Sequence, residues 1–428
     1  MDTIFAQATV MGRAGVAVVR VSGPDAFAIG ESLAGSLPEP RRSAVRNLHG
    51  PDGSLLDQAL VLRFAGPHSF TGEDVVEFHL HGSIAVIRAV LRCLGAFPNT
   101  RLAEPGEFSR RALENGRLDL VQIEGLGDLI DAETEAQRKQ AMLGFSGKLG
   151  ERVEQWRLDL IRSASLLTVT IDFADEDVPI DVTPEVTALL QGVMQGIDAE
   201  IAGVGAAERI RMGFEVAIIG PANAGKSTLL NALAGRDAAI TSEVAGTTRD
   251  VIEVRMDIGG LPVTFLDTAG LRETEDSVEK IGVQRAVARS EAADLRVFLC
   301  EEDEKLMVQP LPDDIQVLPK ADMRQDKTGA ISGRTGEGLS ALIQKIQSIL
   351  EGRVQNAGLA TQERHRVALL HARESLQSAI VMASGGADQY DFAAEELRLA
   401  IQALESLIGR VDVENFLDEI FANFCIGK

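Results

Sequence analysis

The feature that most constrains this chain is the stretch 216–231, in which a glycine-rich loop joins an apolar run to a helical one. The apolar run 216–219 is typical of a buried strand. It is followed by Gly-x-x-x-x-Gly-Lys-Ser over 220–227 and by a helical pattern over 228–233. Strand, glycine loop, lysine and helix in this order are the pattern of a phosphate-binding loop. Glycines let backbone N–H groups approach phosphate oxygens, and the positive end of the helix dipole adds to the attraction. The sequence therefore predicts a nucleotide-binding α/β domain.

Side chains within this loop have separate predicted roles. Lys226 reaches the β- and γ-phosphates, and the hydroxyl of Ser227 is a ligand for Mg²⁺. Asn223 is a candidate ligand for a monovalent cation between the phosphates, in a chain where no arginine finger is evident. The predicted nucleotide contacts in the loop are Asn223, Ala224, Gly225, Lys226, Ser227 and Thr228.

Two downstream segments are predicted to surround the γ-phosphate. Thr248, in Gly-Thr-Thr-Arg-Asp, completes the Mg²⁺ shell. Asp267 ends an apolar strand at Asp-x-x-Gly, where it supports Mg²⁺ from behind, and the N–H of Gly270 senses the γ-phosphate. The predicted contacts in these segments are Ser242, Glu243, Val244, Ala245, Gly246, Thr247, Thr248, Asp267, Thr268, Ala269 and Gly270.

Two later loops predict that the base is guanine. Residues 317–322 resemble the Asn-Lys-x-Asp guanine reader, in which the final aspartate accepts from the base N1–H and N2–H₂ groups, and residues 331–334 resemble the Ser-Ala-Lys loop that contacts guanine O6. Pro319 replaces the usual asparagine, so the loop loses an amide that ties it to the phosphate loop, and we expect weakened GTP affinity or selectivity. The predicted contacts are Lys320, Asp322, Ser332, Gly333 and Arg334. Together these motifs predict a Ras-like GTPase domain.

Hydrolysis requires a group that orients the attacking water. Leu271 follows the Asp-x-x-Gly where many such domains carry a glutamine, and a leucine cannot hold water. Glu279, in the segment that would form switch II, is the leading catalytic candidate because a carboxylate can orient or deprotonate water. On position alone, a solvated charge on a helix remains the alternative.

Composition limits the partners and the compartment. The net charge of −22 and the single Trp and Tyr argue against a broad basic or base-stacking surface, so any RNA contact must be local or supplied by a partner. Three scattered cysteines fit a reducing compartment. The chain shows no signal peptide and no apolar run long enough to span a bilayer, so we expect a soluble, cytoplasmic protein with no membrane role.

The hydrophobic periodicity predicts a multidomain α/β and all-α chain. Strands are predicted at 15–21, 60–64 and 75–81 and a helix at 84–94, followed by helical spacing on both sides of the nucleotide domain. We expect one helical domain interrupted by an inserted nucleotide domain, with two separate bundles as the alternative. The predicted domains are 1–116 (mixed α/β), 117–212 (first helical part), 213–352 (Ras-like domain) and 353–428 (second helical part).

Several motifs together resemble one family. These are 220–227, Ala-Gly-Thr-Thr-Arg-Asp at 245–250, Asp-Thr-Ala-Gly-Leu-Arg at 267–272, Gly-Glu-Asp at 72–74, His-Gly at 81–82, Pro-Gly-Glu-Phe-Ser at 105–109 and the terminal Phe-Cys-Ile-Gly-Lys at 424–428. The chain resembles the tRNA-modification GTPases of the MnmE (TrmE) family over essentially its whole length.

The resemblance implies a homodimer formed through an N-terminal domain that is similar to folate-binding aminomethyl-transfer domains. It implies a tetrahydrofolate derivative (5-formyl- or methylene-tetrahydrofolate) as one-carbon donor, and an FAD- and NADH-dependent partner, MnmG, in a heterotetramer-type complex. The product would be an aminomethyl-type group, of the carboxymethylaminomethyl class, on C5 of the wobble uridine of certain tRNAs. GTP binding would dimerise the G domains across K⁺, and hydrolysis to GDP would drive the complex.

The resemblance also assigns residues. Folate would be bound by Arg20, Glu77, Arg117 and Lys428, and K⁺ would be held by Asn223, Ser242, Val244 and Thr247. Mg²⁺ would be held by Ser227 and Thr248, and catalysis would use Glu279 and the terminal Cys425.

The residues alone leave plainer alternatives open. Arg20 and Glu77 could be strand-edge charges, and Cys425 a small core residue. The cluster of Arg101, Arg110, Arg111 and Arg117 could contact tRNA phosphates or form a solvated face. A GTPase switch in ribosome assembly, with the N-terminal domain serving only to dimerise, is the competing function.

Overall fold

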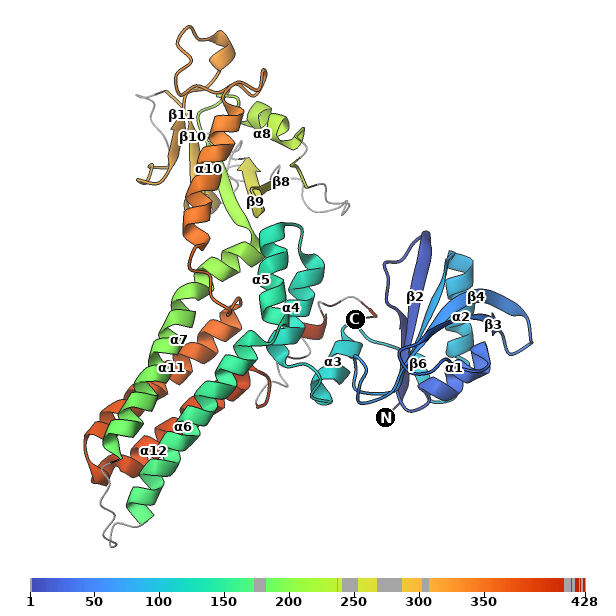
Figure 1. Ribbon diagram of the computed structural model, residues 1–428. Helices are drawn as coiled ribbons and strands as arrows, with labels where there is room; N and C mark the ends of the chain where they lie inside the picture. The colour runs from blue at the N-terminus through green and yellow to red at the C-terminus, as the bar shows by residue number, and fades with distance from the viewer. Residues whose placement is uncertain are drawn as a thin grey trace, which may run out of the picture. The chain divides into compact units, whose positions relative to one another are not determined.

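The computed structural model describes residues 2–428 except 173–181, 237, 241–252, 268–286, 302–307, 412–416, 418–419, 423, 425 and 428 (Figure 1). The chain forms two compact units, Met1–Gly127 with Leu404–Lys428, and Asp128–Ala403. No helix of the described part is long and apolar enough to cross a membrane.

The first unit is built on a six-stranded sheet of order β3-β4-β5-β2-β1-β6, in which only the β1–β6 pair is parallel. Two helices on one face pack with the strands into a core that includes Val76, Phe78 and Leu80. The elements are β1 (Thr3–Gln7), β2 (Ala14–Ser22), α1 (Ala26–Ala34), β3 (Ser43–His49), β4 (Leu55–Phe64), β5 (Val75–Gly82), α2 (Ile84–Leu94) and β6 (Thr100–Leu102). The three predicted strands and the predicted helix are confirmed as β2, β4, β5 and α2.

The other face of the sheet is covered at the β1 end. Ile4 and Ala6 pack there with Phe108 of α3 (Glu107–Glu114), while Phe5 between them faces the α1–α2 core. α4 (Leu120–Asp131) begins beyond α3, and the backbone N–H of Leu120 donates to the carbonyl of Ile408 at 3.2 Å. The chain's last segment therefore belongs to this unit.

The terminal residues contact the same end of the sheet. Ile426 forms an antiparallel bridge with Pro105. A Cβ on Gly427 would lie 2.2 Å from the carbonyl oxygen of Gln7, so only glycine fits this approach. Gln7 pairs with Val19 on β2, the residue before Arg20. The end of the chain is thus held beside the strand that carries a predicted folate ligand.

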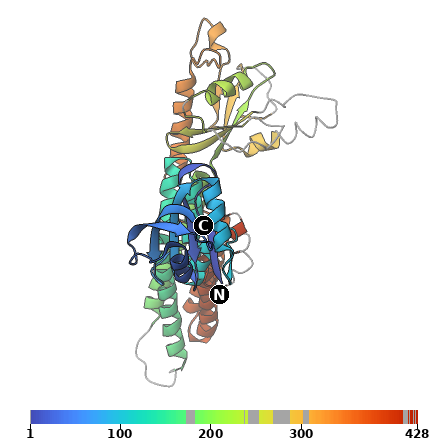
Figure 2. The same cartoon turned by 90° about the vertical axis from the view of Figure 1, so that its right-hand side faces the viewer.

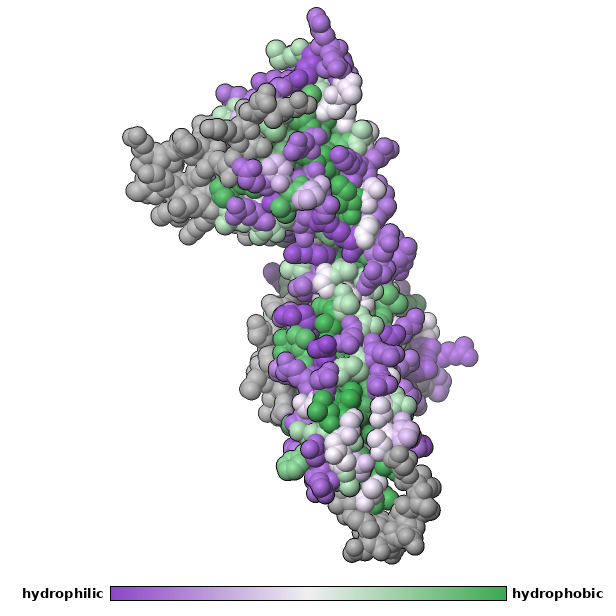
Figure 3. Space-filling view, turned by 90° about the vertical axis from the view of Figure 1, so that its left-hand side faces the viewer, coloured by the Kyte–Doolittle hydropathy of each residue, from purple (hydrophilic) through white to green (hydrophobic). Residues whose placement is uncertain are grey.

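The second unit contains a helical bundle and a second sheet. α7 precedes this sheet in the sequence and packs against α6 and also against α11, which follows the sheet (Figures 1 and 2). Helices from both sides of the nucleotide domain therefore share one bundle, and Figure 3 shows hydrophilic and hydrophobic residues interspersed over its face. The helices are α5 (Glu135–Phe145), α6 (Lys148–Asp172), α7 (Thr183–Met212), α11 (Glu363–Ser384) and α12 (Tyr390–Leu407), whose last turn lies in the first unit.

The second sheet has the order β11-β10-β7-β9-β8, with β7 parallel to β9 and β10, and β8 antiparallel to β9. Alternate residues of β7 enter two different cores, one with Val216 and Ile218 and the other with Ala217 and Ile219. A strand buried on both faces reads as a continuous apolar run. The elements are β7 (Phe214–Ile219), α8 (Lys226–Ala234), β8 (Glu253–Ile258), β9 (Leu261–Asp267), β10 (Leu295–Leu299), β11 (Ile315–Val317) and α10 (Leu339–Val354).

A buried carboxylate fixes the chain where it returns from α10 to the bundle. Glu200 of α7 is 3% exposed, accepts from the backbone N–H groups of Leu359 (2.8 Å) and Ala360 (3.2 Å), and pairs with Arg152 of α6. We expect Glu200→Ala to lower the free energy of unfolding by about 3 kcal/mol, because two backbone donors and a guanidinium lose their acceptor. Urea unfolding followed by circular dichroism measures this change.

Asp198 provides the matched control, since it lies on the same helix and its ion pair with Arg373 is about half exposed. We expect Asp198→Ala to cost less than about 1 kcal/mol. Equal urea midpoints for the two variants would contradict the role given to Glu200.

Candidate functional site

The phosphate-loop motif connects β7 to α8, as predicted. Gly220 is required because a Cβ there would lie 2.4 Å from the carbonyl oxygen of Leu299. Gly225, at the N-cap of α8, has φ 100°, in the region that favours glycine. Asn223 also has a positive φ, of 63°. The loop thus opens at the carboxyl ends of parallel strands, where α/β sheets bind ligands.

Lys226 is almost completely buried in this loop. Its side chain is 7% exposed, and Nζ donates to the carbonyl oxygens of Gly220 (2.7 Å) and Pro221 (2.9 Å). The ammonium group is therefore held inside the loop by main-chain acceptors.

Ser227 and Asp267 are brought together as the Mg²⁺ prediction requires. The Ser227 hydroxyl donates to Asp267 Oδ2 at 3.0 Å. Asp267 is 8% exposed, and its Oδ1 is buried with no hydrogen-bond partner among the residues that the structure describes. A buried carboxylate oxygen beside a hydroxyl oxygen is a donor set suited to a hard divalent cation. These residues fit Mg²⁺.

The two loops predicted to recognise the base are joined by main-chain hydrogen bonds. The N–H of Leu318 donates to Gly329 at 3.0 Å, and the N–H of Ile331 donates to Leu318 at 2.8 Å. A Cβ on Gly333 would lie 2.7 Å from the backbone of Thr228, so glycine lets the second loop reach α8. The predicted O6 loop therefore lies against the first turn of α8, and the predicted reader loop is bonded to it.

Asp322 is oriented by the neighbouring loop. Its Oδ1 accepts from the Ser332 hydroxyl at 2.6 Å, and the Ser332 oxygen in turn accepts from the N–H groups of Arg334 (3.2 Å) and Thr335 (3.3 Å). The Ser332 hydrogen bond holds the pKa of Asp322 below its ordinary value of 3.8. The carboxylate stays ionised and available as an acceptor.

These loops enclose a cavity of about 250 Å³. It is lined by Asn223, Ala224, Gly225, Thr228, Leu229, Leu299, Lys320, Asp322, Met323, Ile331, Ser332, Gly333 and Arg334. Nine of the residues predicted to contact the nucleotide are therefore gathered around one space. Its walls supply a carboxylate, cationic side chains and apolar surface.

A part of the predicted site lies outside the described residues. These positions are Ser242, Glu243, Val244, Ala245, Gly246, Thr247, Thr248, Thr268, Ala269, Gly270, Glu279, Cys425 and Lys428. The catalytic pair, most of the K⁺ ligands and one folate ligand therefore remain predictions.

The remaining folate candidates lie in the first unit. Arg20 and Glu77 are cross-strand partners on β2 and β5, and Arg20 Nε donates to Glu77 Oε1 at 2.9 Å. The Arg20 guanidinium lies 5.1 Å from the ring centre of Phe70 and 5.4 Å from that of Phe108. Neither phenylalanine has a role that its sequence position predicts. Phe108 stood within a family motif, which was the signal available.

Arg117 reaches the same part of the unit. A Cβ on Gly72 would lie 3.1 Å from Arg117 Cγ, and Gly72 is two residues from Phe70. The structure thus places Arg117 next to a loop whose aromatic residue lies against Arg20.

The predicted basic cluster is largely neutralised. Arg111 is 7% exposed and pairs with Asp2 (2.9 Å), Glu73 (3.0 Å) and Glu107 (3.4 Å). Arg101 also pairs with Asp2 and Glu107. For Arg111 both expectations, a phosphate contact and a solvated face, are wrong, because its side chain is buried among these carboxylates. Arg101 keeps an exposed side chain, so its two alternatives stay open.

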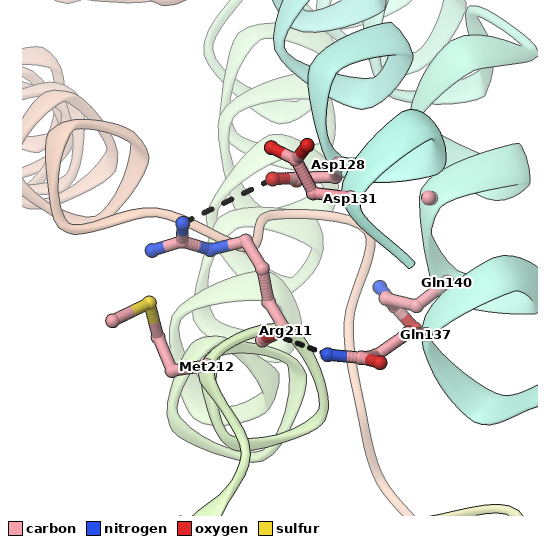
Figure 4. Close-up of a pocket in the computed structure, with 7 residues that line it drawn as sticks. Asp128, Asp131, Gln137, Gln140, Arg211 and Met212 are labelled. Atoms are coloured by element: carbon pink, nitrogen blue, oxygen red, sulfur yellow. Dashed lines mark hydrogen bonds and ion pairs between the residues drawn. The ribbon is translucent and has the colours of Figure 1, made fainter. Parts of the chain in front are cut away.

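A second cavity, of about 190 Å³, lies between α4, α5 and the end of α7 (Figure 4). Figure 4 shows the Arg211 guanidinium directed toward Asp128, 3.9 Å away, while Gln137 Nε2 donates to the Arg211 carbonyl at 3.0 Å. The N–H of Ala136 donates to Gly260 in the β8–β9 turn. Helix α5 therefore connects the bundle to the second sheet. Among the described residues no group of three or more His, Cys, Asp or Glu side chains is arranged to hold a metal ion.

Comparison with known proteins gives matches over the whole chain. Residues 120–425 match the family described as MnmE helical domain, and residues 3–117 match GTP-binding protein TrmE N-terminus. The chain is 62% identical over 428 residues to the tRNA modification GTPase MnmE of Roseobacter denitrificans and, separately, to that of Ruegeria pomeroyi, with 100% of both chains covered in each case. A solved structure of Aquifex aeolicus Era bound to GDP·AlF₄⁻ is 25% identical, and the match covers 38% of this chain and 66% of the Era chain. Its TM-score is 0.26, which is too low to support an argument about the fold.

Proposed function

Because the chain belongs to the MnmE family of tRNA modification GTPases, we propose that it hydrolyses GTP in the modification of tRNA. The observation that carries this proposal is the cavity between the phosphate loop and the two base-recognition loops. Asp322 accepts from the guanine N1–H and N2–H₂ groups, and Lys226 exchanges its carbonyl partners for oxygens of the β- and γ-phosphates. Ser227 and Thr248 would hold Mg²⁺, with Asp267 behind the ion, and the bound ion would neutralise charge on those phosphates.

The finer reaction follows the family resemblance. In our proposal the protein acts as a homodimer with MnmG and places an aminomethyl-type group on C5 of the wobble uridine in the cytoplasm. The one-carbon unit comes from a tetrahydrofolate derivative bound by Arg20, Glu77, Arg117 and Lys428. The Arg20 guanidinium, held by a carboxylate and two aromatic rings, supports an anion-binding role. Cys425 is proposed to act in the chemistry.

The experiment that tests the function is mass spectrometry of tRNA from a strain that lacks this protein. We expect the carboxymethylaminomethyl-type wobble uridine to disappear and to return when the intact gene is supplied. A gene encoding Lys226→Ala should fail to restore it. Normal modification in the deletion strain would overturn the proposal and favour a role in ribosome assembly.

Glu279 is proposed to orient the attacking water. Glu279→Gln keeps the size of the side chain but weakens it as a base, so we expect kcat for GTP hydrolysis to fall by at least about 100-fold. The dissociation constant for GTP should stay within about twofold, because binding relies on other groups. Single-turnover hydrolysis and fluorescence titration measure the two quantities, and a near-normal kcat would remove Glu279 from the mechanism.

Asn223, Ser242, Val244 and Thr247 are proposed to hold K⁺ beside the phosphates. We expect hydrolysis to be at least about tenfold faster in K⁺ than in Na⁺ at equal ionic strength. This effect is smaller than the increase in kcat of about 10³–10⁵-fold that an arginine finger supplies. Asn223→Ala should remove most of the difference between the two salts. Equal wild-type rates in K⁺ and Na⁺ would contradict the site.

A further inference from the structure

One arginine that belongs to no motif holds the guanine-recognition loop. Arg324 Nε donates to the carbonyl oxygen of Pro319 at 2.7 Å, and its guanidinium also pairs with Glu301. Glu301 follows β10, whose end residue Leu299 lines the cavity, and Pro319 follows β11. A single side chain therefore connects the loops that leave two neighbouring strands at the binding edge of the sheet.

The main chain on either side of the Pro319–Lys320 peptide is bonded to the second loop, by the N–H of Leu318 to Gly329 (3.0 Å) and by the N–H of Ala321 to Ile331 (3.0 Å). The peptide itself has a different partner. Pro319 has neither a backbone N–H nor a polar side chain, so its carbonyl is its one hydrogen-bonding group. The next residue, Lys320, has φ 58°, a left-handed conformation that a non-glycine residue keeps only when its surroundings impose it. The hydrogen bond from Arg324 fixes the plane of the peptide that joins these two residues. It thereby sets the direction in which the loop continues to Asp322.

Arg324 acts on the cavity without lining it. Lys320, Asp322 and Met323 line the cavity, whereas Arg324 is not among its lining residues. The Arg324 side chain is 25% exposed, and its partner Glu301 is 56% exposed. Solvent weakens this exposed ion pair, so of the two contacts of Arg324 the bond to the Pro319 carbonyl constrains the loop more strongly.

We infer that Arg324 is the positioning residue of the guanine-recognition loop, supplying the tether that Pro319 cannot. This inference rests on the proposed function, because it concerns the same guanine site. It also offers a compensation for the loss of the asparagine amide, from which we expected weakened GTP affinity or selectivity. The arginine places the loop in its binding conformation before the base arrives, which raises affinity without touching the base.

The test compares GDP binding by the wild type and by Arg324→Ala, using fluorescence titration. We expect the dissociation constant to rise about tenfold, the loss typical of one charge-assisted hydrogen bond. In steady-state hydrolysis KM for GTP should rise similarly while kcat is unchanged, because the groups that act on the γ-phosphate lie elsewhere. A variant whose G domain is misfolded or distorted would show a lower kcat as well.

Two control variants separate the contacts of Arg324. Glu301→Gln removes only the rim ion pair, and we expect less than a twofold change. Arg366→Ala removes an exposed arginine paired with Glu363 on α11, and we expect no change. Adding Pro319→Asn to Arg324→Ala should recover most of the lost affinity, because the asparagine amide offers a new tether.

The outcomes distinguish this inference from the function on which it depends. Failure of the wild type to bind GDP would remove the proposed function, and the inference with it. Normal wild-type binding together with an Arg324→Ala dissociation constant within twofold of it would overturn the inference alone. A fall in kcat at constant KM, or no recovery by Pro319→Asn, would equally overturn it. Thermal unfolding of each variant confirms that folded protein is compared.

Discussion

Replacing Lys226 by alanine is expected to raise the dissociation constant for GTP by at least about 100-fold. The Lys226 ammonium is buried and already held by the carbonyls of Gly220 and Pro221, so the loop positions a positive charge where the β- and γ-phosphates bind. The loss for GDP should be smaller, since GDP lacks the γ-phosphate. Isothermal titration with GTP and with GDP in Mg²⁺ and K⁺ buffer measures both.

Two controls show that this loss would arise from the phosphate contact. Lys345→Ala removes an exposed lysine of α10 and should leave GTP binding unchanged. The Lys226→Ala protein without nucleotide should unfold at a urea concentration close to that of the wild type, because the variant also removes the cost of burying a charge. Unchanged GTP affinity in Lys226→Ala would remove the phosphate-loop interpretation.

The sequence predicted best where local chemistry determines the structure. The phosphate loop needs a strand, two glycines and a helix in immediate succession, and β7, Gly220, Gly225 and α8 occur as expected. Asp322 and Ser332 were also predicted, because short motifs with fixed spacing carry them. In each case the signal lies within a few residues, so no long-range contact has to be known.

Strands without clear alternation were missed. β1 is five residues long and entirely buried, because its two faces enter different cores, so no polar residues alternate along it. In β3 burial does alternate, but the residue types do not follow it, because Val45 lies on the exposed face and Arg46 on the more buried one. Neither strand therefore shows in its sequence the apolar–polar period of two that identifies a strand.

Contacts between distant segments could not be read from the sequence. Arg111 is neutralised by Asp2 and Glu73, which are 109 and 38 residues away. The same limit applies to Arg324, whose partner is a backbone carbonyl and therefore leaves no residue type to recognise. Pro319 was visible as a departure from the motif, but the side chain that compensates for it required the structure.

Asp322→Asn is expected to exchange guanine selectivity for xanthine selectivity. Guanine presents two donors, N1–H and N2–H₂, to the two acceptor oxygens of Asp322, whereas an asparagine presents one acceptor and one donor. We expect the dissociation constant for GDP to rise on the order of 10²–10³-fold. This loss is smaller than the discrimination of about 10⁴–10⁵-fold that a buried hydrogen-bonding site achieves, because Asp322 is exposed. Xanthosine diphosphate, which carries a carbonyl in place of the amino group, should bind more tightly than GDP.

The lowered pKa of Asp322 gives this site a defined pH dependence. Its carboxylate remains charged below the ordinary value of 3.8, so the acceptor is fully present above that value and is lost only as the pH falls through the lowered pKa. The Asp322 contact should therefore contribute equally to GDP affinity between about pH 8 and pH 5, where an ordinary carboxyl is also ionised, so Asp322→Asn should change the pH profile of GDP binding little in this range. A decline of affinity within this range would indicate a different titrating group.

The orientation of the new asparagine is set by Ser332. The Ser332 oxygen accepts from the N–H groups of Arg334 and Thr335, which leaves its own proton to donate to Oδ1 of residue 322. Asparagine Oδ1 therefore faces Ser332, and its NH₂ group faces the base, where it meets the xanthine carbonyl. Adding Ser332→Ala to Asp322→Asn frees the amide to rotate, so GDP should regain part of its affinity. If Asp322→Asn bound GDP as the wild type does, Asp322 would not be the guanine reader.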